Sequence, residues 1–482
     1  MPNSINKKTA FKFINSIKKN NKNTLSVTLV GSFSDNFNIK KAGDIDIIII
    51  CKKLDKYYFN NCLSQLKKIK QKYFGPEDKL IINSTFGPIK FYKKNTIVFH
   101  VMIYDLKSHV EHTINSPFTC YDWERSKIFV GKSLKELSPV YNLQLRDFSE
   151  ARRNVKEYLN DLSKNRISYR EYDFKNKEVK LVKKYFKIDN LNSRDFIFHI
   201  IKFLLINFIK YQKQTNKIIH KRIIEKKFLE IVKSRLDLQK FIKLRQYKKQ
   251  KKNLSIIEPK KLALKFIKKF ENHIKDQNKT NKVFFSRHKK TKLNKNIFLG
   301  QKLNPNIIDN KTNNEFKNLY FNKCYSSPST RCLQTAQIVC EKKKITLDQN
   351  LKEINYGDAE GLTYKELKAQ FSQIIKKWNE GKDPKFPNGE SLSDANKRLN
   401  NFIKKTLNPN KSKKVMNFLI FTHNVILRCL IGNIYKIKKS NWYKINIDYF
   451  NLLEFELRKN CILSNIDRKK YYSLFKNFIK NK

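Results

Sequence analysis

The sequence lacks an apolar run long enough to cross a bilayer. Its best run, residues 196–209, is interrupted by His199 and Lys202. At roughly 14 residues it falls short of the about 20 that a spanning helix needs, so a buried helix is predicted there. Residues 1–19 contain no apolar core followed by a small-residue cleavage site, so they do not resemble a secretory signal. We therefore expect a cytoplasmic protein with no membrane partner.

Closely spaced cysteines are also missing. The chain has 8 Cys, scattered between positions 51 and 461, and no two of them form a CxxC pair. A disulfide scaffold or a structural zinc site needs such spacing. The pattern argues against both and fits a reducing compartment.

Acidic residues are scarce: 42 Asp and Glu stand against 103 Lys and Arg, which gives a net charge of +61. Such an excess can mark a nucleic-acid-binding protein. However, only about 16 of the basic residues are Arg, and the Lys residues are spread along the whole chain among abundant Asn, Ile and Phe. We interpret the charge as a compositional drift toward Lys, with an RNA-binding or RNA-modifying protein kept as an alternative.

What is present divides the chain into segments of different character. Its 482 residues, 40% of them hydrophobic, are enough for two to four domains. Periodicity predicts strands and helices over 1–150, helices over 151–270, a polar linker over 271–282 and alternating strands and helices over 283–482. The predicted fold class is therefore multidomain: a mixed sheet first, a helical extension next, and a three-layer α/β/α domain last.

The most informative residues follow predicted strands in the last segment. The strand 283–286 leads into Arg287 and His288, and the strand 418–421 leads into Thr422 and His423. Between them lie Ser326-Ser327-Pro328-Ser329-Thr330-Arg331 and the stretch Leu351 to Gly361, which contains Glu353. Catalytic groups gather at the carboxyl edge of such sheets.

These residue types suit phosphoryl chemistry without a metal. Arg287 and Arg331 can hold phosphoryl oxygens with bidentate guanidinium groups. A neutral imidazole can attack phosphorus, a second one can donate to the transferred group, and a carboxylic acid can protonate the leaving oxygen. The spacing therefore predicts a phosphoryl-transfer site.

The same four elements, in this order over about 180 residues, resemble the histidine phosphatase superfamily with its phosphoglycerate-mutase-like fold. The resemblance implies that His288 becomes phosphorylated and that Glu353 is the proton donor. It also implies that Arg287, Arg331 and His423 complete the phosphate pocket, with Asn294 nearby. Lys289 stands where the family has Gly, a residue that lets the backbone approach the phosphate closely. A phosphate-binding but inactive domain is the alternative.

A second constellation lies near the start of the chain. The predicted strand 24–30 leads into Gly31 and Ser32, and Asp44 and Asp46 precede the apolar run 47–50. Alternate residues of a strand point to one face, so the two carboxylates would repel each other unless a cation lay between them. Mg²⁺ bound by carboxylates and substrate phosphates would satisfy both. The alternative is an exposed turn capped by Asp44.

This Gly-Ser and Asp-x-Asp pattern resembles the polymerase-β-like nucleotidyltransferase superfamily. The resemblance implies an NTP held at Gly31 and Ser32 and Mg²⁺ or Mn²⁺ held by Asp44 and Asp46. It also implies a third acid on a later strand, here residues 96–105. His100 occupies the middle of that strand and Asp105 its end, so we expect His100 as a weak third ligand or as an ordinary core histidine.

Together these features predict a bifunctional enzyme. A histidine phosphatase acting through phosphohistidine would follow a metal-dependent nucleotidyltransferase, with the helical segment helping to hold substrate. The expected partners are an NTP and a phosphorylated small molecule. A second hypothesis keeps only the phosphatase active and makes the first half a regulatory nucleotide-binding module.

Overall fold

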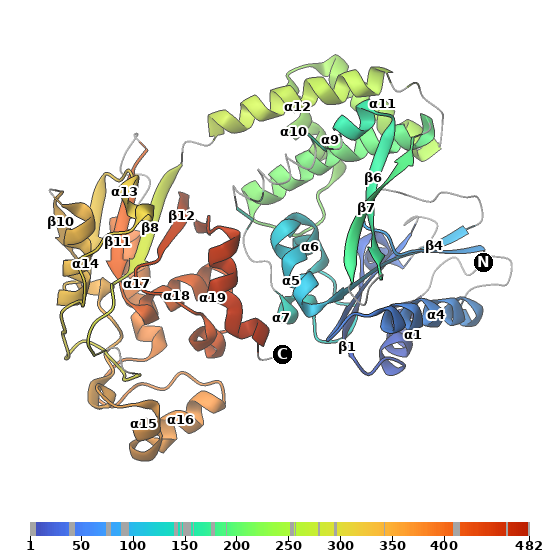
Figure 1. Ribbon diagram of the computed structural model, residues 1–482. Coiled ribbons are helices and arrows are strands. Elements are labelled where there is room, and N and C mark those ends of the chain that lie inside the picture. Colours follow the sequence, from blue (N-terminus) through green and yellow to red (C-terminus); the bar gives the residue numbers. More distant parts are fainter. Residues whose placement is uncertain are drawn as a thin grey trace. The chain divides into compact units, whose positions relative to one another are not determined.

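The computed structural model of the protein describes residues 6–37, 44–73, 79–87, 96–138, 143–144, 147, 156–157, 159–174, 179–188, 190–250, 255, 257–277, 280–293, 296–341, 343–407, 415–458 and 461–480. The chain forms two compact units, Met1–Asp276 and Gln277–Lys482 (Figure 1). The first two predicted segments therefore belong to one unit, and each unit is described by itself below.

The first unit is built on a mixed five-stranded sheet with the order β3-β4-β2-β1-β5. Strands β2, β3 and β4 are parallel, whereas β1 runs antiparallel to its neighbours β2 and β5. The strands are β1 (Thr24–Val30), β2 (Ile45–Cys51), β3 (Lys79–Asn83), β4 (Thr96–Asp105) and β5 (Phe129–Gly131). The predicted mixed sheet is confirmed.

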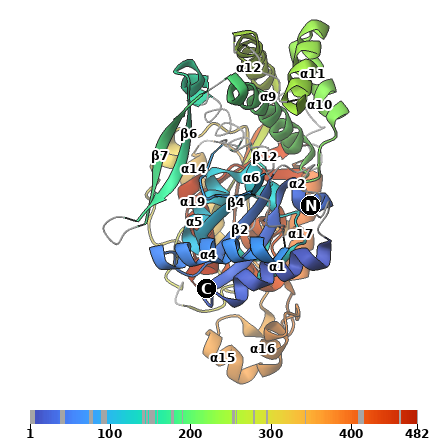
Figure 2. The same ribbon diagram turned by 90° about the vertical axis from the view of Figure 1, so that its right-hand side faces the viewer.

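One face of this sheet packs into a hydrophobic core. Ile45, Ile47 and Ile49 of β2 alternate into it and meet helices α1 (Lys7–Lys19) and α4 (Lys56–Tyr73). Figure 2 shows these two helices lying side by side across that face. The intervening residues, such as Asp46, point to the opposite face, where the polar groups of the site are found.

The second half of this unit corrects the helical prediction for 151–270. A two-stranded antiparallel ribbon, β6 (Arg166–Asp173) and β7 (Lys180–Lys187), precedes the helices. All eight residues of β7 are exposed, so no alternation of apolar and polar residues marks it as a strand. The other elements are α5 (Leu106–Asn115), α6 (Pro117–Trp123), α7 (Leu134–Leu137), α9 (Asn190–Lys213), α10 (Lys221–Val232), α11 (Arg235–Gln250) and α12 (Ile257–Gln277).

The predicted linker 271–282 is also wrong in its bounds. Helix α12 continues to Gln277 and strand β8 begins at Asn281, so most of this polar stretch is regular structure. Ile274 is buried near the end of this helix, and a single apolar residue in a polar stretch is too sparse to indicate a helical period.

The second unit contains a six-stranded sheet with the order β10-β9-β11-β8-β12-β13. The first four strands in this order are parallel, and β12 and β13 are antiparallel additions at one edge. The strands are β8 (Asn281–Arg287), β9 (Lys323–Ser326), β10 (Ile345–Leu347), β11 (Asn417–Thr422), β12 (Leu452–Arg458) and β13 (Cys461–Ser464). This is the predicted α/β arrangement.

Helices alternate with the strands of the second unit, and one more helix follows the last strand. The main ones are α14 (Thr330–Cys340), α17 (Leu392–Thr406), α18 (Asn424–Ile434) and the last helix α19 (Arg468–Lys480). Shorter elements are α13 (Asn314–Lys317), α15 (Tyr364–Gln370), α16 (Ser372–Asn379) and the 3₁₀ turns η2 (Gln349–Leu351), η3 (Gly357–Ala359) and η5 (Lys439–Lys444). In the described ranges of both units, no helix is long and apolar enough to span a membrane.

Candidate active sites

The carboxyl ends of β8, β9 and β11 meet at one edge of the second sheet. The pairing Thr422 with Arg287 and Phe421 with Ser326 places the residues that follow these strands next to one another. His288 and His423 therefore lie together, with ring centroids 5.2 Å apart. The positions predicted from strand ends are brought into one cluster.

The imidazole of His288 is held in one tautomer. Its Nδ1 lies 2.6 Å from the main-chain carbonyl oxygen of Lys289, which can only accept a hydrogen bond. The proton must therefore sit on Nδ1, and Nε2 keeps its lone pair. Burial, followed by the charges of Arg331 and Arg287, lowers the pKa of His288 well below its usual range. The ring is neutral near pH 7, as a nitrogen nucleophile must be.

Two guanidinium groups border this imidazole. Arg331 donates to the carbonyl oxygens of Gly300 and Leu303 at 2.8 and 3.1 Å, and Arg287 donates to that of Ile447 at 2.8 Å. The Nε of each arginine is buried and has no partner among the residues described. Since an unpaired buried cationic donor is costly, an oxyanion bound between them would satisfy both.

Glu353 reaches the site from the loop after η2. Its carboxylate accepts from the main-chain N–H groups of Ile354 at 3.0 Å and Val425 at 3.2 Å, and Val425 lies two residues after His423. Burial raises the pKa of Glu353 in spite of these hydrogen bonds and of the charges of Arg331 and Arg287. A raised pKa is what a general acid requires.

His423 is fully buried and already has side-chain partners. Its Nε2 lies 2.9 Å from Ser327 Oγ and 3.3 Å from Cys332 Sγ. Burial, followed by the charge of Arg331, lowers the pKa of His423 well below its usual range. Ser327 belongs to the predicted Ser-Ser-Pro element, but its contact with His423 was not foreseen.

The departure at Lys289 is accommodated without backbone strain, because this residue does not have a positive φ. Its Nζ donates to Asp309 and to the carbonyl oxygen of Lys311, and it lies 4.7 Å from the ring centroid of Phe450. The ammonium group is therefore paired with other groups rather than with the site. The predicted phosphate-binding residue Asn294 falls outside the described residues.

Sequence reasoning missed two contributors to this cluster. The ring of Tyr449 covers the Arg287 guanidinium at 3.6 Å and lies 5.8 Å from the His288 ring. It belongs to a loop before β12 and carries no motif. The second is an ion pair: Arg398 binds both carboxylate oxygens of Glu390 and donates to the carbonyl oxygen of Glu353, which fixes the loop that carries the acid.

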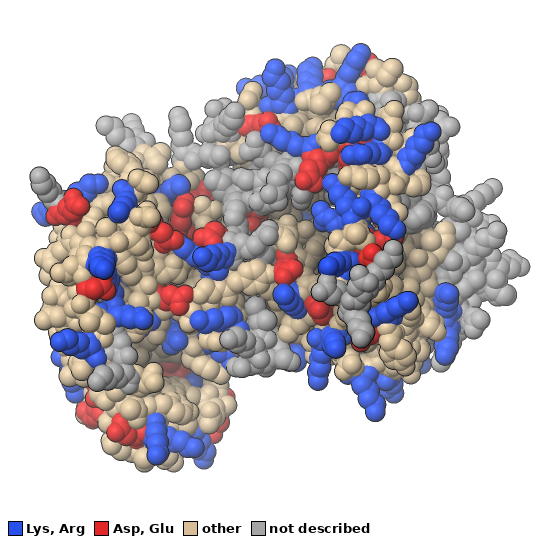
Figure 3. All heavy atoms as spheres, viewed as in Figure 1, with Lys and Arg blue, Asp and Glu red and all other residues tan. Residues whose placement is uncertain are grey.

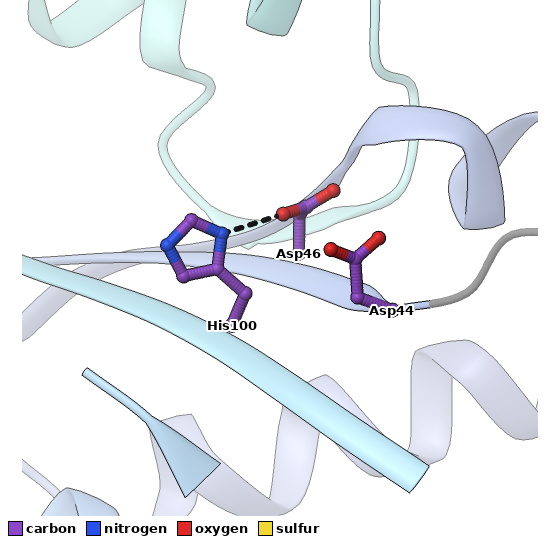
Figure 4. A group of neighbouring side chains, drawn as sticks. All are labelled: Asp44, Asp46 and His100. Atoms are coloured by element: carbon purple, nitrogen blue, oxygen red, sulfur yellow. Dashed lines mark hydrogen bonds and ion pairs between the residues drawn. The ribbon is translucent and has the colours of Figure 1, made fainter. Parts of the chain in front are cut away.

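The second cluster lies in the first unit, on the open face of its sheet. Asp44, Asp46 and His100 each offer one ligand atom, and these atoms lie within 4.8 Å of one another (Figure 4). Asp46 and His100 are direct neighbours across β2 and β4. Two carboxylates and an imidazole are a donor set that fits a divalent cation, so these residues are suited to hold a metal ion.

His100 therefore faces the site rather than the core. Its Nε2 lies 3.0 Å from the carbonyl oxygen of Thr85, so this nitrogen carries a proton, and its Nδ1 lies 2.9 Å from Asp46 Oδ1. Burial by itself lowers the pKa of His100, but the hydrogen bond to Asp46 and the charge of that carboxylate outweigh burial and raise it. Asp105 is occupied elsewhere: it caps helix α5 through Ser108.

Gly31 stands where β1 turns into α2 (Gly31–Asn36), followed by Ser32. Its φ is +73°, and a Cβ there would lie 2.2 Å from Asp46 Oδ2. Only glycine fits this position while Asp46 stays in place. The predicted nucleotide-binding turn and the predicted metal ligand Asp46 therefore lie in direct proximity, and glycine at position 31 is needed for both to keep their places.

The charge distribution shows no built stripe on the face that is visible in Figure 3. Lys and Arg are scattered over both units there and are interspersed with Asp and Glu.

Comparisons with known proteins assign each unit to a class. Residues 283–464 match the histidine phosphatase superfamily (branch 1), and residues 11–104 match the nucleotidyltransferase domain. A 2,3-bisphosphoglycerate-dependent phosphoglycerate mutase of Azorhizobium caulinodans is 29% identical over 160 residues, which are 30% of this chain and 77% of that protein. A phosphoglycerate mutase of Schizosaccharomyces pombe is 31% identical over 119 residues, but only 23% of this chain and 55% of that protein are covered.

Solved structures similar to this chain include a phosphoserine phosphatase from Entamoeba histolytica, with 22% identity and a TM-score of 0.35 over 39% of this chain and 95% of that one. An α-ribazole phosphatase from Shigella flexneri has 18% identity and a TM-score of 0.33, over 38% of this chain and 95% of that one. The family models thus match a nucleotidyltransferase domain in the first unit and a histidine phosphatase domain in the second.

Proposed function

We propose that the C-terminal unit hydrolyses phosphomonoesters through a phosphohistidine at His288. The observation that carries this proposal is the fixed tautomer. The N–H group at Nδ1 donates a hydrogen bond to the Lys289 carbonyl oxygen, so the lone pair is on Nε2 and is free to react. The buried Nε groups of Arg287 and Arg331 are the donors that a phosphoryl group would engage.

In the first step, Nε2 of His288 forms a bond to phosphorus as the ester P–O bond breaks, and the leaving oxygen takes the proton of Glu353. In the second step, water attacks the phosphohistidine and gives its proton back to the Glu353 carboxylate. The N–P bond breaks, and the products are an alcohol and inorganic phosphate. The two arginines stabilise the negative charge of the transferred group throughout.

This proposal is tested on the full-length protein with a panel of phosphorylated small molecules. His288→Ala is expected to abolish phosphate release and an acid-labile phosphoenzyme. Asp44→Asn, a change in the other unit, serves as the matched control and is expected to leave both intact. Full phosphate release by His288→Ala would overturn the assignment. Transfer of the phosphoryl group to a second substrate hydroxyl, without release of phosphate, would instead indicate mutase activity.

The cluster in the first unit supports a second activity, nucleotidyl transfer from an NTP. Asp44, Asp46 and His100 would hold Mg²⁺ or Mn²⁺, which when bound offsets the charge of the triphosphate and activates the acceptor hydroxyl. The missing side chain of Gly31 leaves Asp46 accessible to the substrate. The acceptor is expected to be a phosphorylated small metabolite, so that both units act on related molecules in the cytoplasm.

Incubation with α-labelled NTPs and candidate acceptors tests this second activity. Transfer of label that needs Mg²⁺ or Mn²⁺ and is lost in Asp46→Asn supports it. Saturable NTP binding without any transfer would favour the regulatory module instead. Tight RNA binding with a steep dependence on salt concentration would favour an RNA-directed role.

A further inference from the structure

The open face of the first sheet forms the floor of a cavity of about 470 Å³ that begins at the metal-ligand cluster. His100, Met102 and Tyr104 alternate along β4 and all line it. Tyr104 lies four residues after His100 along the strand, a distance of roughly 13 Å. A ligand that touches both ends is therefore a small molecule extended along the strand.

The ribbon β6–β7 and two helices form the walls of the cavity. Ser168, Tyr169 and Arg170 of the ribbon form one wall, and Arg170 is fixed there by two main-chain hydrogen bonds of 2.8 Å to Phe86. Helices α6 and α9 form the other wall. Aromatic and aliphatic side chains supply much of its surface: Phe86, Phe118, Trp123, Phe203 and Ile206.

Three buried polar atoms on residues that line the cavity lack partners. They are Tyr104 Oη, His112 Nε2 and Asn207 Nδ2, none of which has a hydrogen bond to any residue that the structure describes. Tyr104 is 4% exposed and Asn207 is 3% exposed. A buried polar atom without a partner costs free energy, and three around one cavity indicate that a ligand supplies the missing bonds.

These three groups are uncharged. The ring of His112 is stacked between those of Tyr104 and Trp123, with centroids 5.2 and 5.3 Å away. Burial, followed by the charge of Arg170, lowers the pKa of His112 to about 4, so it is neutral at pH 7. Because the faces of His112 are covered by the two neighbouring rings, only its edge is left to form a hydrogen bond.

Two of the cations that line the cavity, Lys210 and Arg125, are paired with carboxylates. Asp122 accepts hydrogen bonds from Lys210 at 2.5 Å and from Arg125 at 2.6 Å, and Arg125 also reaches Asp35. The unpaired polar atoms belong to uncharged groups beside aromatic rings, so the group that they would bind is expected to be flat, with polar atoms along one edge and apolar faces. A nucleobase has these properties, whereas a sugar would need more hydrogen-bonding groups on its faces.

We propose that this cavity binds the base of the NTP and that Asn207, His112 and Tyr104 recognise its polar edge. The proposal rests on the nucleotidyl-transfer function proposed above, and it assigns the residues that choose which NTP is used. The triphosphate would lie at the Asp46 and His100 end and the base roughly 13 Å along β4. Asn207 lies on α9, more than a hundred residues after Tyr104, so this site exists only because the helical extension closes over the sheet.

The test measures the affinity of the full-length protein for ATP, GTP, CTP, UTP and inorganic tripolyphosphate in the presence of Mg²⁺. One base is expected to bind best. Asn207→Leu and Tyr104→Phe are each expected to lower that affinity about tenfold and to reduce the differences between bases. The affinity for tripolyphosphate should not change, because it has no base.

The same two variants carry a second readout. Each removes a buried atom that has no partner, so the nucleotide-free protein is expected to melt at a higher temperature than the wild type. The matched control is Tyr58→Phe, on the opposite face of the sheet, where the hydroxyl is 2.6 Å from Thr24 Oγ1. This control should be destabilised and should keep the wild-type preference among the four nucleotides.

Two outcomes would overturn the proposal, and they are distinguishable. If both variants bound all four NTPs like the wild type while Asp46→Asn still lost metal-dependent transfer, the base would lie elsewhere and the proposed function would stand. If the wild type bound tripolyphosphate but no NTP more tightly, or bound neither, the nucleotidyltransferase proposal would fail as well. Should Asn207→Leu not fold, Asn207→Asp, of the same size, is expected to change which base is preferred.

Discussion

His288 and His423 follow neighbouring parallel strands, and their rings meet edge to face at 61° with centroids 5.2 Å apart. The pair is buried between two arginines, and the pKa of each ring is lowered by burial and by the charge of Arg331. Both imidazoles are thus neutral when a phosphate enters. The pair can then divide the work, with one ring as nucleophile and the other as a positioned polar neighbour.

Removal of the second histidine is expected to slow the reaction without abolishing it. His423→Asn should lower kcat for phosphomonoester hydrolysis by about 10²- to 10³-fold, because it removes one donor from the transition state. Steady-state kinetics on any substrate from the panel measures this effect. Combination with His288→Ala should add nothing, since residues that act as a unit are not additive. A wild-type rate for His423→Asn would exclude it from the phosphate pocket.

The raised pKa of Glu353 gives an expectation for pH. In the proposed mechanism, the free enzyme needs neutral His288 and protonated Glu353. Because the pKa of His288 lies below 6.5 and that of Glu353 above 4.5, kcat/KM should persist below pH 6.5 and decline on the alkaline side. Glu353→Gln should slow substrates with poor leaving groups more than those with good ones, and it should abolish the alkaline decline. If the alkaline decline of kcat/KM persisted in Glu353→Gln, it would have to come from the titration of another group.

Lys289 is expected to tolerate replacement. Lys289→Met keeps the length of the side chain and loses only the bonds to Asp309 and to the carbonyl oxygen of Lys311. Phosphatase kcat should stay within about threefold of the wild type, while thermal stability falls slightly. A loss of activity as large as that of His288→Ala would place the ammonium group in the reaction and would contradict its pairing with Asp309.

The two activities are expected to respond independently to metal removal. Chelation with EDTA, or Asp44→Asn and Asp46→Asn, should abolish nucleotidyl transfer and leave phosphate release unchanged, because each unit has its own sheet. Parallel assays of one preparation check this expectation. If chelation removed both activities, the phosphohistidine mechanism without a metal would be wrong.

His100→Asp separates a ligand from a structural residue. If the side chain serves the metal, the change supplies an oxygen ligand, and metal-dependent transfer should be retained or raised. If it serves only to bridge Asp46 and the Thr85 carbonyl oxygen, the new carboxylate would face Asp46 unpaired. The protein would then lose stability, by about 1–3 kcal/mol, with no gain in rate. Melting temperature and transfer rate, measured together, decide between the two.

Much of this architecture could be predicted because its strands are buried runs that end in polar residues. The apolar residues before Arg287 and His423, and those after Asp46, marked both sheets, and the polar residue types beside these runs marked the chemistry. The ribbon β6–β7 could not be found in this way, since a strand that is exposed on both sides carries no alternating pattern.

The contacts between segments that are distant in the chain could not be predicted from the sequence. Tyr449 covers Arg287 from a loop without any motif. Tyr104, His112 and Asn207 share a cavity although they belong to three different elements. Such neighbours are set by how the elements pack and not by local periodicity, so their function becomes visible only in three dimensions.

The bond from His288 to the Lys289 carbonyl oxygen has a consequence for how this chain can change. In the proposed mechanism the reactive nitrogen is selected by the main chain, and every amino acid provides the same carbonyl oxygen. A drift of composition toward Lys can therefore replace the side chain at 289 without changing which nitrogen faces the phosphorus. The tautomer of His288 therefore does not depend on which side chain follows it in the sequence.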